Sequence, residues 1–145
     1  IQISSIKFCT PKMLEDFRKI QLVKDHIESR QKEIEAYNKK QDLDTSVLVN
    51  GRKLTNVGVF QAYLENYLNE SPDINENMTV MVRQLPAAQY GLPIEIYAFS
   101  KIKEWKAYEK VIADLFDHIL ASASAFDLTI FESPSGSDIQ LIQHI

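Results

Sequence analysis

Two segments in the middle of the chain carry the apolar pattern of β-strands. Residues 78–85 (MTVMVRQL) and 92–99 (LPIEIYAF) are rich in β-branched and aromatic residues, and six residues separate them. Pro93 has no backbone N–H, so the start of the second strand is expected to be unpaired on that side. The pattern predicts a hairpin with a loop of about six residues.

The hairpin brings two opposite charges close to each other. Counting back from the loop places Leu85 near Leu92 and Arg83 near Ile94, which leaves Glu95 diagonal to Arg83. Arg83 and Glu95 then form either a cross-strand ion pair or two solvated side chains on an exposed face of the sheet.

Three other segments have apolar residues at the three- and four-residue spacing of amphipathic helices. The first begins at Thr10-Pro11, where the Thr hydroxyl can accept from a free helical N–H and Pro fits the first turn. Thr55-Asn56 starts the second, and Ser100 is expected to cap the third. We interpret their apolar faces as core; these are Met13, Phe17 and Ile20, then Phe60, Tyr63, Leu64, Tyr67 and Leu68, then Trp105, Tyr108, Ile112, Leu115, Phe116 and Ile119.

The region between the first two helices differs in character. Residues 22–40 have few apolar positions and several pairs of opposite charge at i,i+4, which predicts a solvated helix that protrudes or bridges. Residues 41–46 are polar and predict a loop. Residues 47–49 predict a short extended piece that turns sharply at Asn50-Gly51.

Strands are also predicted near both ends of the chain. Residues 1–8 and 126–131 are rich in β-branched and aromatic residues, and the first run shifts phase at Ser4-Ser5 as a bulged strand does. With a helical insertion over about 23–58 set aside, the order is strand, helix, strand, strand, helix, strand. This order predicts an α+β fold, a ferredoxin-like split βαββαβ sheet backed by helices.

The predicted domain covers residues 1–136, and residues 137–145 are a C-terminal tail. The tail carries apolar Ile139, Leu141, Ile142 and Ile145, and is either an extra strand or disordered.

Composition narrows the class of protein. The 145 residues are enough for one domain with its own core. The single cysteine excludes a disulfide framework, and no apolar run approaches the roughly 18 residues of a membrane span. Four glycines cannot build a Gly-rich phosphate-binding loop. Residues 78–85 lack the aromatic pair of ferredoxin-like RNA-binding proteins, so we expect no nucleic-acid partner and no cofactor.

The net charge of −4 is unevenly distributed. Residues 1–53 hold 11 Lys and Arg against 8 Asp and Glu, whereas residues 54–145 hold 5 against 12. Ends of opposite sign favour head-to-tail self-association. The chain also begins at Ile1, inside a predicted strand and without Met or a leader, which indicates a piece of a longer protein.

The titratable residues do not form a recognisable catalytic or metal-binding motif. His26, His118 and His144 are far apart and lack metal-ligand spacing. Asp114, Asp117 and His118 look like an acid/base cluster, but adjacent positions on a helix point in different directions. We interpret His118 as a boundary imidazole in preference to a catalytic one, and we expect no metal ligand.

Cys9 is the one candidate nucleophile. It lies at the predicted junction of a strand and a helix, where a helix N-terminus can activate a thiol. A small buried residue is the interpretation we favour, because no base is placed beside it and free cysteines are among the most buried residues. We therefore expect no catalytic residue and no enzymatic activity.

Six segments, in order, resemble one protein family. They are Ile6-Lys7-Phe8-Cys9-Thr10, Asn50-Gly51-Arg52-Lys53-Leu54-Thr55-Asn56, Met81-Val82-Arg83-Gln84-Leu85, Gly91-Leu92-Pro93-Ile94-Glu95-Ile96-Tyr97, Ala113-Asp114-Leu115-Phe116-Asp117-His118 and Pro134-Ser135-Gly136. Together they resemble the C-terminal cytoplasmic domain of the small-conductance mechanosensitive ion channel family, closest to its miniconductance branch. The resemblance covers about residues 1–136, and the insertion at 23–58 is similar to the extra segment of that branch.

The resemblance implies a function for the whole protein. It implies a channel in the bacterial inner membrane that releases solutes on hypoosmotic shock, with its transmembrane part preceding Ile1. In that family the subunits form a ring, usually of seven, whose soluble domains enclose a cytoplasmic vestibule. This domain would assemble the vestibule and filter solutes, would reach the membrane only through the missing N-terminal part, and can be monomeric in isolation.

A second class of function stays open. Many ferredoxin-like domains are regulatory modules that bind a small ligand at a subunit interface, and fold alone does not decide between the two. A concave pocket of several hundred Å³ lined by convergent polar groups favours a ligand-binding module, whereas a wide, water-filled interior favours the vestibule.

Overall fold

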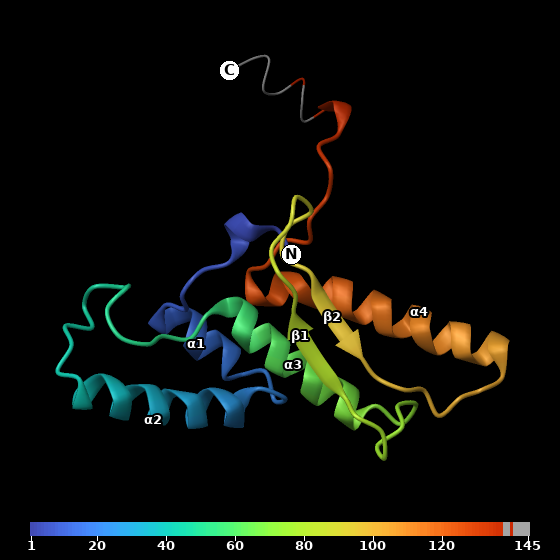
Figure 1. The fold of residues 1–145 in the computed structure, drawn as a ribbon, viewed down its shortest axis with the longest axis horizontal. Coiled ribbons are helices and arrows are strands. Elements are labelled where there is room, and N and C mark those ends of the chain that lie inside the picture. Colours follow the sequence, from blue (N-terminus) through green and yellow to red (C-terminus); the bar gives the residue numbers. More distant parts are fainter. Residues whose placement is uncertain (138–139, 141–145) are drawn as a thin grey trace.

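The chain folds into a mixed α/β structure in which helices pack on one small sheet (Figure 1). The computed structural model describes residues 1–137 and residue 140. Its elements are η1 (Ile3–Ser5), α1 (Pro11–Phe17), α2 (Lys24–Lys40), α3 (Asn56–Glu70), β1 (Met81–Gln84), β2 (Ile94–Tyr97), α4 (Trp105–Ser122) and η2 (Ala123–Phe126), where η denotes a 3-10 helix. The predictions for the tail, including its apolar Ile139, Leu141, Ile142 and Ile145, lie outside the described residues.

Strands β1 and β2 form the predicted hairpin, but its register differs by one residue from the expected one. Arg83 lies opposite Glu95, and Val82 lies opposite Ile96. Directly opposed residues point to the same face of a sheet, so this register turns Val82 and Ile96 together toward α3. The expected register would have placed Val82 beside the charged Glu95. Burial of the apolar pair accounts for the difference.

Helices α1 and α3 begin where the pattern predicts, and α4 does not. The Thr10 hydroxyl accepts from Met13 N–H at the start of α1, and the Thr55 hydroxyl accepts from Gly58 N–H at the start of α3. At α4 the predicted cap is wrong, because the Ser100 hydroxyl bonds locally to Ile102. The carboxylate of Glu104 caps α4 instead.

The two terminal segments predicted as strands form no ladder in the described chain. The first turns into η1, because the Ser5 N–H and hydroxyl both donate to Gln2 O. The Ser5 hydroxyl also accepts from Thr129 N–H, at 3.1 Å, where a strand would offer a carbonyl. Asp127 has a φ of 56° and ends η2. Local hydroxyl bonding of this kind competes with sheet formation.

Isolated backbone hydrogen bonds nevertheless arrange these segments side by side. The backbone N of Ile1 donates to Leu92 O and Leu92 N donates to Ile1 O, both at 2.8 Å. Gln2 N donates to Thr129 O at 2.8 Å. The N-terminal segment therefore lies between the residues that lead into β2 and the segment after η2.

An aromatic cluster forms the centre of the core. Phe126 is 1% exposed, and its ring centroid lies 5.4 Å from that of Phe17 and 5.2 Å from those of Phe60 and Tyr63. Because these rings come from α1, α3 and η2, the cluster joins both halves of the chain. The predicted core face of α3 is confirmed by its buried Phe60 and Leu64.

The predicted core face of α4 is only partly buried. Ile119 is buried, whereas Trp105 is 76% exposed and Phe116 is 56% exposed. The helix packs through its C-terminal end, beside η2, and extends away from the aromatic cluster toward its N-terminus (Figure 1). The expectation that the whole stripe forms core is therefore wrong for Trp105, Phe116 and Tyr108, which is 38% exposed.

The insertion is anchored along one side of α2. Helix α2 forms over most of the predicted 22–40, but Val23 and Ile27 are fully buried, so the helix packs against the domain more closely than a freely protruding one. Residues 47–49, predicted as an extended piece, form a turn closed by Asn50 N–H donating to Val47 O at 3.0 Å.

Candidate functional site

A cavity lies between the insertion and the start of the chain's first helix, α1. It has a volume of about 430 Å³ and is open to solvent. Helix α2 supplies one wall, the segment from Asp42 to Leu54 supplies the other, and Leu14 of α1 and Cys9, two residues before that helix, complete the lining. The lining residues are Cys9, Leu14, Gln31, Ile34, Glu35, Asn38, Lys39, Asp42, Leu43, Thr45, Arg52, Lys53 and Leu54.

Asn38 holds the two walls of this cavity together. Its Oδ1 accepts from Arg52 N–H at 2.9 Å, and its Nδ2 donates to Arg52 O at 3.0 Å. Asn38 is 9% exposed. Its side-chain amide takes the place of water as the hydrogen-bond partner of the backbone N–H and carbonyl of Arg52.

Gly51 makes this approach of the two walls feasible. Its φ is +72°, and a Cβ at this position would lie 2.4 Å from Asn38 Oδ1. A residue with a side chain would both strain the backbone and collide with the amide. The sequence predicted a turn at Asn50-Gly51, but it did not predict that Asn38 is its partner.

Charges of both signs line the cavity. Glu35 and Asp42 face it with Lys39, Arg52 and Lys53. The Arg52 guanidinium lies 4.1 Å from the centroid of the Tyr37 ring, in a cation–π contact, and Lys53 Nζ donates to backbone carbonyls of the loop. This lining suits a small polar molecule that carries both charges.

Cys9 lies in the inner wall of the same cavity and is buried, as the sequence predicted. Burial, with a further contribution from the negative charge of Asp127, raises the pKa of its thiol to about 11. The thiol is therefore protonated at neutral pH, whereas the nucleophile in cysteine chemistry is the thiolate. Cys9 has a structural role in this wall.

His118 belongs to an aromatic cluster between α3 and α4. Its ring stacks on that of Tyr67 with centroids 3.9 Å apart and planes 3° from parallel, and its Nε2 lies 2.6 Å from the Tyr63 hydroxyl oxygen. The neighbouring Asp117 is exposed. The structure thus ties His118 to two tyrosines rather than to an acid/base pair with Asp117.

The pKa of Tyr67 is shifted by its surroundings in this cluster. Burial, then the neighbouring Tyr63 and the charge of Asp114, raise the pKa of Tyr67. The signal that could have revealed the cluster is the spacing of Tyr63 and Tyr67, which puts both rings on one face of a helix. The sequence assigned both tyrosines to the core without naming their partner.

The remaining histidines do not form a site with His118. His26 is half-buried and lines another cavity together with Asp25 and Asn66. Burial, and then the positive charge of Arg30, lower the pKa of His26, and Glu33 opposes them. His144 lies outside the described residues. Within residues 1–137 and 140, no group of three His, Cys, Asp or Glu side chains is placed to hold a metal ion.

Arg83 and Glu95 form an ion pair on the outer face of the hairpin. Arg83 Nη2 lies 2.8 Å from Glu95 Oε1, and Arg83 Nε donates to the same oxygen at 3.0 Å. The side chains are 52% and 36% exposed, so the pair contributes at most about 1 kcal/mol. Of the two outcomes expected for these charges, the ion pair is confirmed.

A second, mainly apolar cavity lies where α4 leaves the core. It has a volume of about 360 Å³ and lies between α4 and β2. Its walls include Ile74, Ile96, Ile112, Leu115 and Phe116. The sequence did not predict this groove, because it placed the apolar face of α4 directly on the sheet.

Two comparisons with known proteins were made, one by sequence family and one by fold. No known protein family matches the sequence, and no solved structure matches the fold. Among the helices of the described chain, none is both long enough and apolar enough to cross a membrane.

Proposed function

We propose that this chain is the cytoplasmic vestibule domain of a mechanosensitive ion channel of the small-conductance family, close to its miniconductance branch. In this proposal it has no catalytic role. It assembles, in a ring that is usually of seven subunits, beneath the inner membrane of a bacterium, and it filters the solutes that the open channel releases on hypoosmotic shock. A transmembrane part elsewhere in the protein forms the pore and senses tension.

The observation that carries the proposal is the ordered resemblance of six segments over residues 1–136. Three of those segments also take part in specific interactions here. The segment 50–56 contains the Gly51 turn that meets Asn38, and the hairpin segments contain the ion pair of Arg83 and Glu95.

The hydrogen bonds of the terminal segments support the ferredoxin-like part of the proposal. A split βαββαβ sheet has its first strand between the third and the fourth. Ile1 exchanges hydrogen bonds with Leu92, next to β2, and Gln2 donates to Thr129. We propose that these contacts are the remnant of a four-stranded sheet whose first and fourth strands are shortened where the hydroxyl of Ser5 bonds to Gln2 and Thr129.

The charge distribution supports assembly through unlike surfaces. A ring requires each subunit to present two different faces to its two neighbours. The excess of basic residues over 1–53 and of acidic residues over 54–145 provides faces of opposite sign. Self-association of the domain should therefore weaken as salt is added, and sedimentation that does not change with salt would refute this electrostatic contribution.

The reading frame upstream of Ile1 gives a direct test. The proposal requires several apolar stretches of about 20 residues in that part of the protein. A full reading frame that lacks such stretches would reject the proposed channel function, and the description of the fold would be unaffected.

A second candidate function has an observation of its own. The 430 Å³ cavity of the insertion is concave and is lined by convergent polar groups, including Asn38 and Arg52. This is the kind of pocket expected of a regulatory module that binds a small ligand at a subunit interface.

Calorimetric titration with zwitterionic amino acids tests this second function. A regulatory module should bind one of them with heat that is lost in an Arg52→Ala variant and retained in a control variant, Arg30→Ala, which lies on α2 outside the cavity lining. Titrations without heat for every amino acid would reject the proposed ligand class.

A further inference from the structure

The tip of the insertion is an exposed apolar surface. The insertion tip, residues 47–49, contains Val47, Leu48 and Val49, which are 46%, 60% and 75% exposed. Three consecutive exposed aliphatic residues in a turn are unusual on a surface that otherwise carries polar loops, and such patches commonly mark interaction sites.

The apolar cavity beside α4 is the complementary surface. The α4 groove, defined by Ile74, Ile96, Ile112, Leu115 and Phe116, has a volume of about 360 Å³. Aliphatic and aromatic side chains form most of its walls. A groove of this kind accepts an aliphatic anchor, and anchors buried in such pockets dominate the affinity of interfaces.

The charges around the two surfaces have opposite signs. Basic residues flank the insertion tip, and acidic residues line the cavity that shares Leu115 with the α4 groove. Around the tip the four basic residues Lys39, Lys40, Arg52 and Lys53 outnumber the two acidic ones, Asp42 and Asp44, and the acidic residues of the neighbouring cavity are Glu70, Asp73 and Asp114. Complementary charge of this kind orients two surfaces as they meet.

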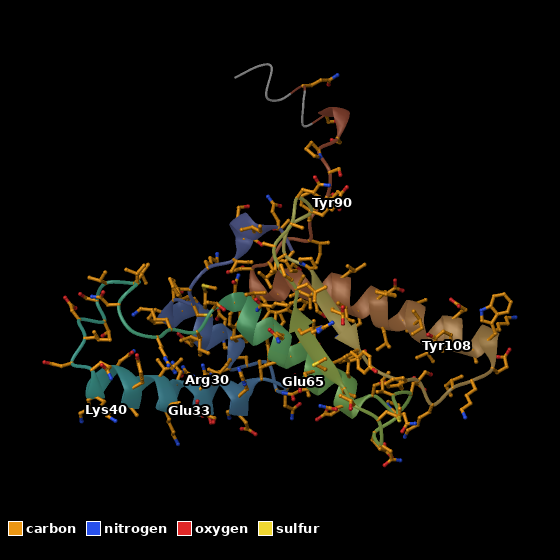
Figure 2. The ribbon with its side chains drawn as sticks, in the orientation of Figure 1. Arg30, Glu33, Lys40, Glu65, Tyr90 and Tyr108 are labelled. Carbon is orange, nitrogen blue, oxygen red and sulfur yellow. The ribbon has the colours of Figure 1, made fainter. Side chains whose placement is uncertain are left out.

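The two surfaces cannot meet within one molecule. The loop that carries the tip follows Lys40 at one end of the molecule, while Tyr108, in the wall of the groove, lies on α4 toward the opposite end (Figure 2). The helices and the sheet stand between them (Figure 1). Only a second copy of the chain can bring a tip to a groove.

We propose that the insertion tip of one copy docks in the α4 groove of the next copy. Such a contact joins two different surfaces, so it repeats from copy to copy and either closes into a ring or continues as a filament. The inference deepens the proposed vestibule by naming the surfaces through which neighbours meet, but it stands on these two surfaces and does not require a channel.

Disulfide cross-linking between two single-cysteine proteins tests the docking. In a Cys9→Ala background, one protein carries Val49→Cys and the other, with a tag that changes its size, carries Phe116→Cys. Both positions are exposed, so both variants should fold, which circular dichroism checks. Under mild oxidation, docking raises the effective concentration of the two thiols, and the mixed disulfide should form about tenfold faster than either homodimer.

Two controls make the result specific. Glu15→Cys, on the exposed side of α1, should give only the background rate with Phe116→Cys. The mixed disulfide of Val49→Cys and Phe116→Cys should also form more slowly at high salt, which screens the flanking charges.

Three results would overturn the proposal. Equal rates for all pairs would show that the surfaces do not dock. A dominant Phe116→Cys homodimer would show that two α4 helices pair with each other instead. A rate that is independent of salt would reject the charge pairing on which the choice of partner depends. If the mixed disulfide does not form but the full-length protein still opens under tension, the docking proposal is rejected and the channel proposal stands. If the mixed disulfide forms but the full-length protein has no membrane spans, the channel proposal is rejected and the docking proposal stands.

Discussion

The side-chain amide of Asn38 brackets the peptide of Arg52, accepting from its N–H at 2.9 Å and donating to its carbonyl at 3.0 Å. This pair of bonds spans 14 residues and closes the loop that follows α2. The shape of the cavity and the position of the insertion tip both depend on it.

Replacing Asn38 by Ala should loosen this loop. The change leaves the N–H and carbonyl of Arg52 without their partners, and we expect the free energy of unfolding to fall by about 1–3 kcal/mol. Urea denaturation measures the loss. The matched control is Asn50→Ala, whose amide makes one exposed bond to Asp44 O; a loss as large as that for Asn38 would contradict the special role of the bracket.

Gly51→Ala should lower the free energy of unfolding as much as Asn38→Ala does, for a different reason. The new Cβ would lie 2.4 Å from Asn38 Oδ1 on a backbone with a φ of +72°. The double variant Gly51→Ala, Asn38→Ala removes the collision, so its loss of stability should be smaller than the sum of the two single losses. Additive losses would show that the two residues act independently.

Asn56 should be the most sensitive polar residue of the core. It is fully buried, its Oδ1 accepts from Lys7 N–H at 3.0 Å, and its Nδ2 donates to Ser5 O at 2.9 Å and to Phe126 O at 3.1 Å. Asn56→Ala leaves these groups unsatisfied, and we expect a loss of about 2–4 kcal/mol.

Asn56→Asp distinguishes bonding from packing. The aspartate has nearly the same volume but cannot donate, so it should be about as destabilising as the alanine. A native-like melting temperature for Asn56→Asp would show that the donated bonds to Ser5 and Phe126 contribute little.

The Cys9 thiol should react slowly in the folded protein. With the pKa raised to about 11 by burial, little thiolate is present at neutral pH, and the side chain is only 8% exposed. The rate of reaction with a thiol reagent such as iodoacetamide should rise by orders of magnitude when the protein is unfolded in urea. Equal rates in the folded and unfolded states would show that the thiol is reactive in the folded protein, and Cys9 would again be a candidate nucleophile.

Stability should fall as the pH drops through the titration of His26. Its pKa is lowered in the folded state, chiefly by burial and then by the charge of Arg30. The unfolded state therefore takes up a proton first, near its ordinary pKa of about 6.5, so the effect is absent above this pH and grows below it.

The variant His26→Gln isolates this contribution. Its loss of stability between about pH 7.5 and pH 5 should be smaller than that of the wild type, measured by urea denaturation at each pH. Arg30 and Glu33, which form an ion pair along α2 at 2.7 Å and are both labelled in Figure 2, stay in both proteins and provide a common background. Identical pH profiles would contradict the lowered pKa.

Local patterns predicted the elements of this fold well, and long-range bonds decided what the patterns could not. The spacing of Phe60 and Leu64 predicted a buried helix face, and Thr55 predicted where that helix begins. The prediction of two terminal strands was wrong because the hydroxyl of Ser5 bonds to Gln2 and Thr129. No pattern in the local sequence indicates that a particular serine will make such bonds.

In the candidate site, too, the sequence predicted local features but not the long-range contacts. The Asn50-Gly51 turn was predictable from its dipeptide, but its partner Asn38 lies on another helix, and one sequence does not show which polar residue a distant turn will meet. Likewise, the apolar stripe of α4 was visible, but its incomplete burial depends on where the whole helix leaves the core. Trp105 and Phe116 are apolar in sequence and exposed in the structure.

Pressure-clamp recording of the full-length protein tests the central claim most directly. The protein is expressed in giant bacterial spheroplasts that lack their own mechanosensitive channels, and its presence in the membrane is checked by immunoblotting. The vestibule proposal predicts small single-channel currents that appear with suction and are absent from spheroplasts without the gene. Membranes that contain the protein and show no pressure-dependent current would contradict it.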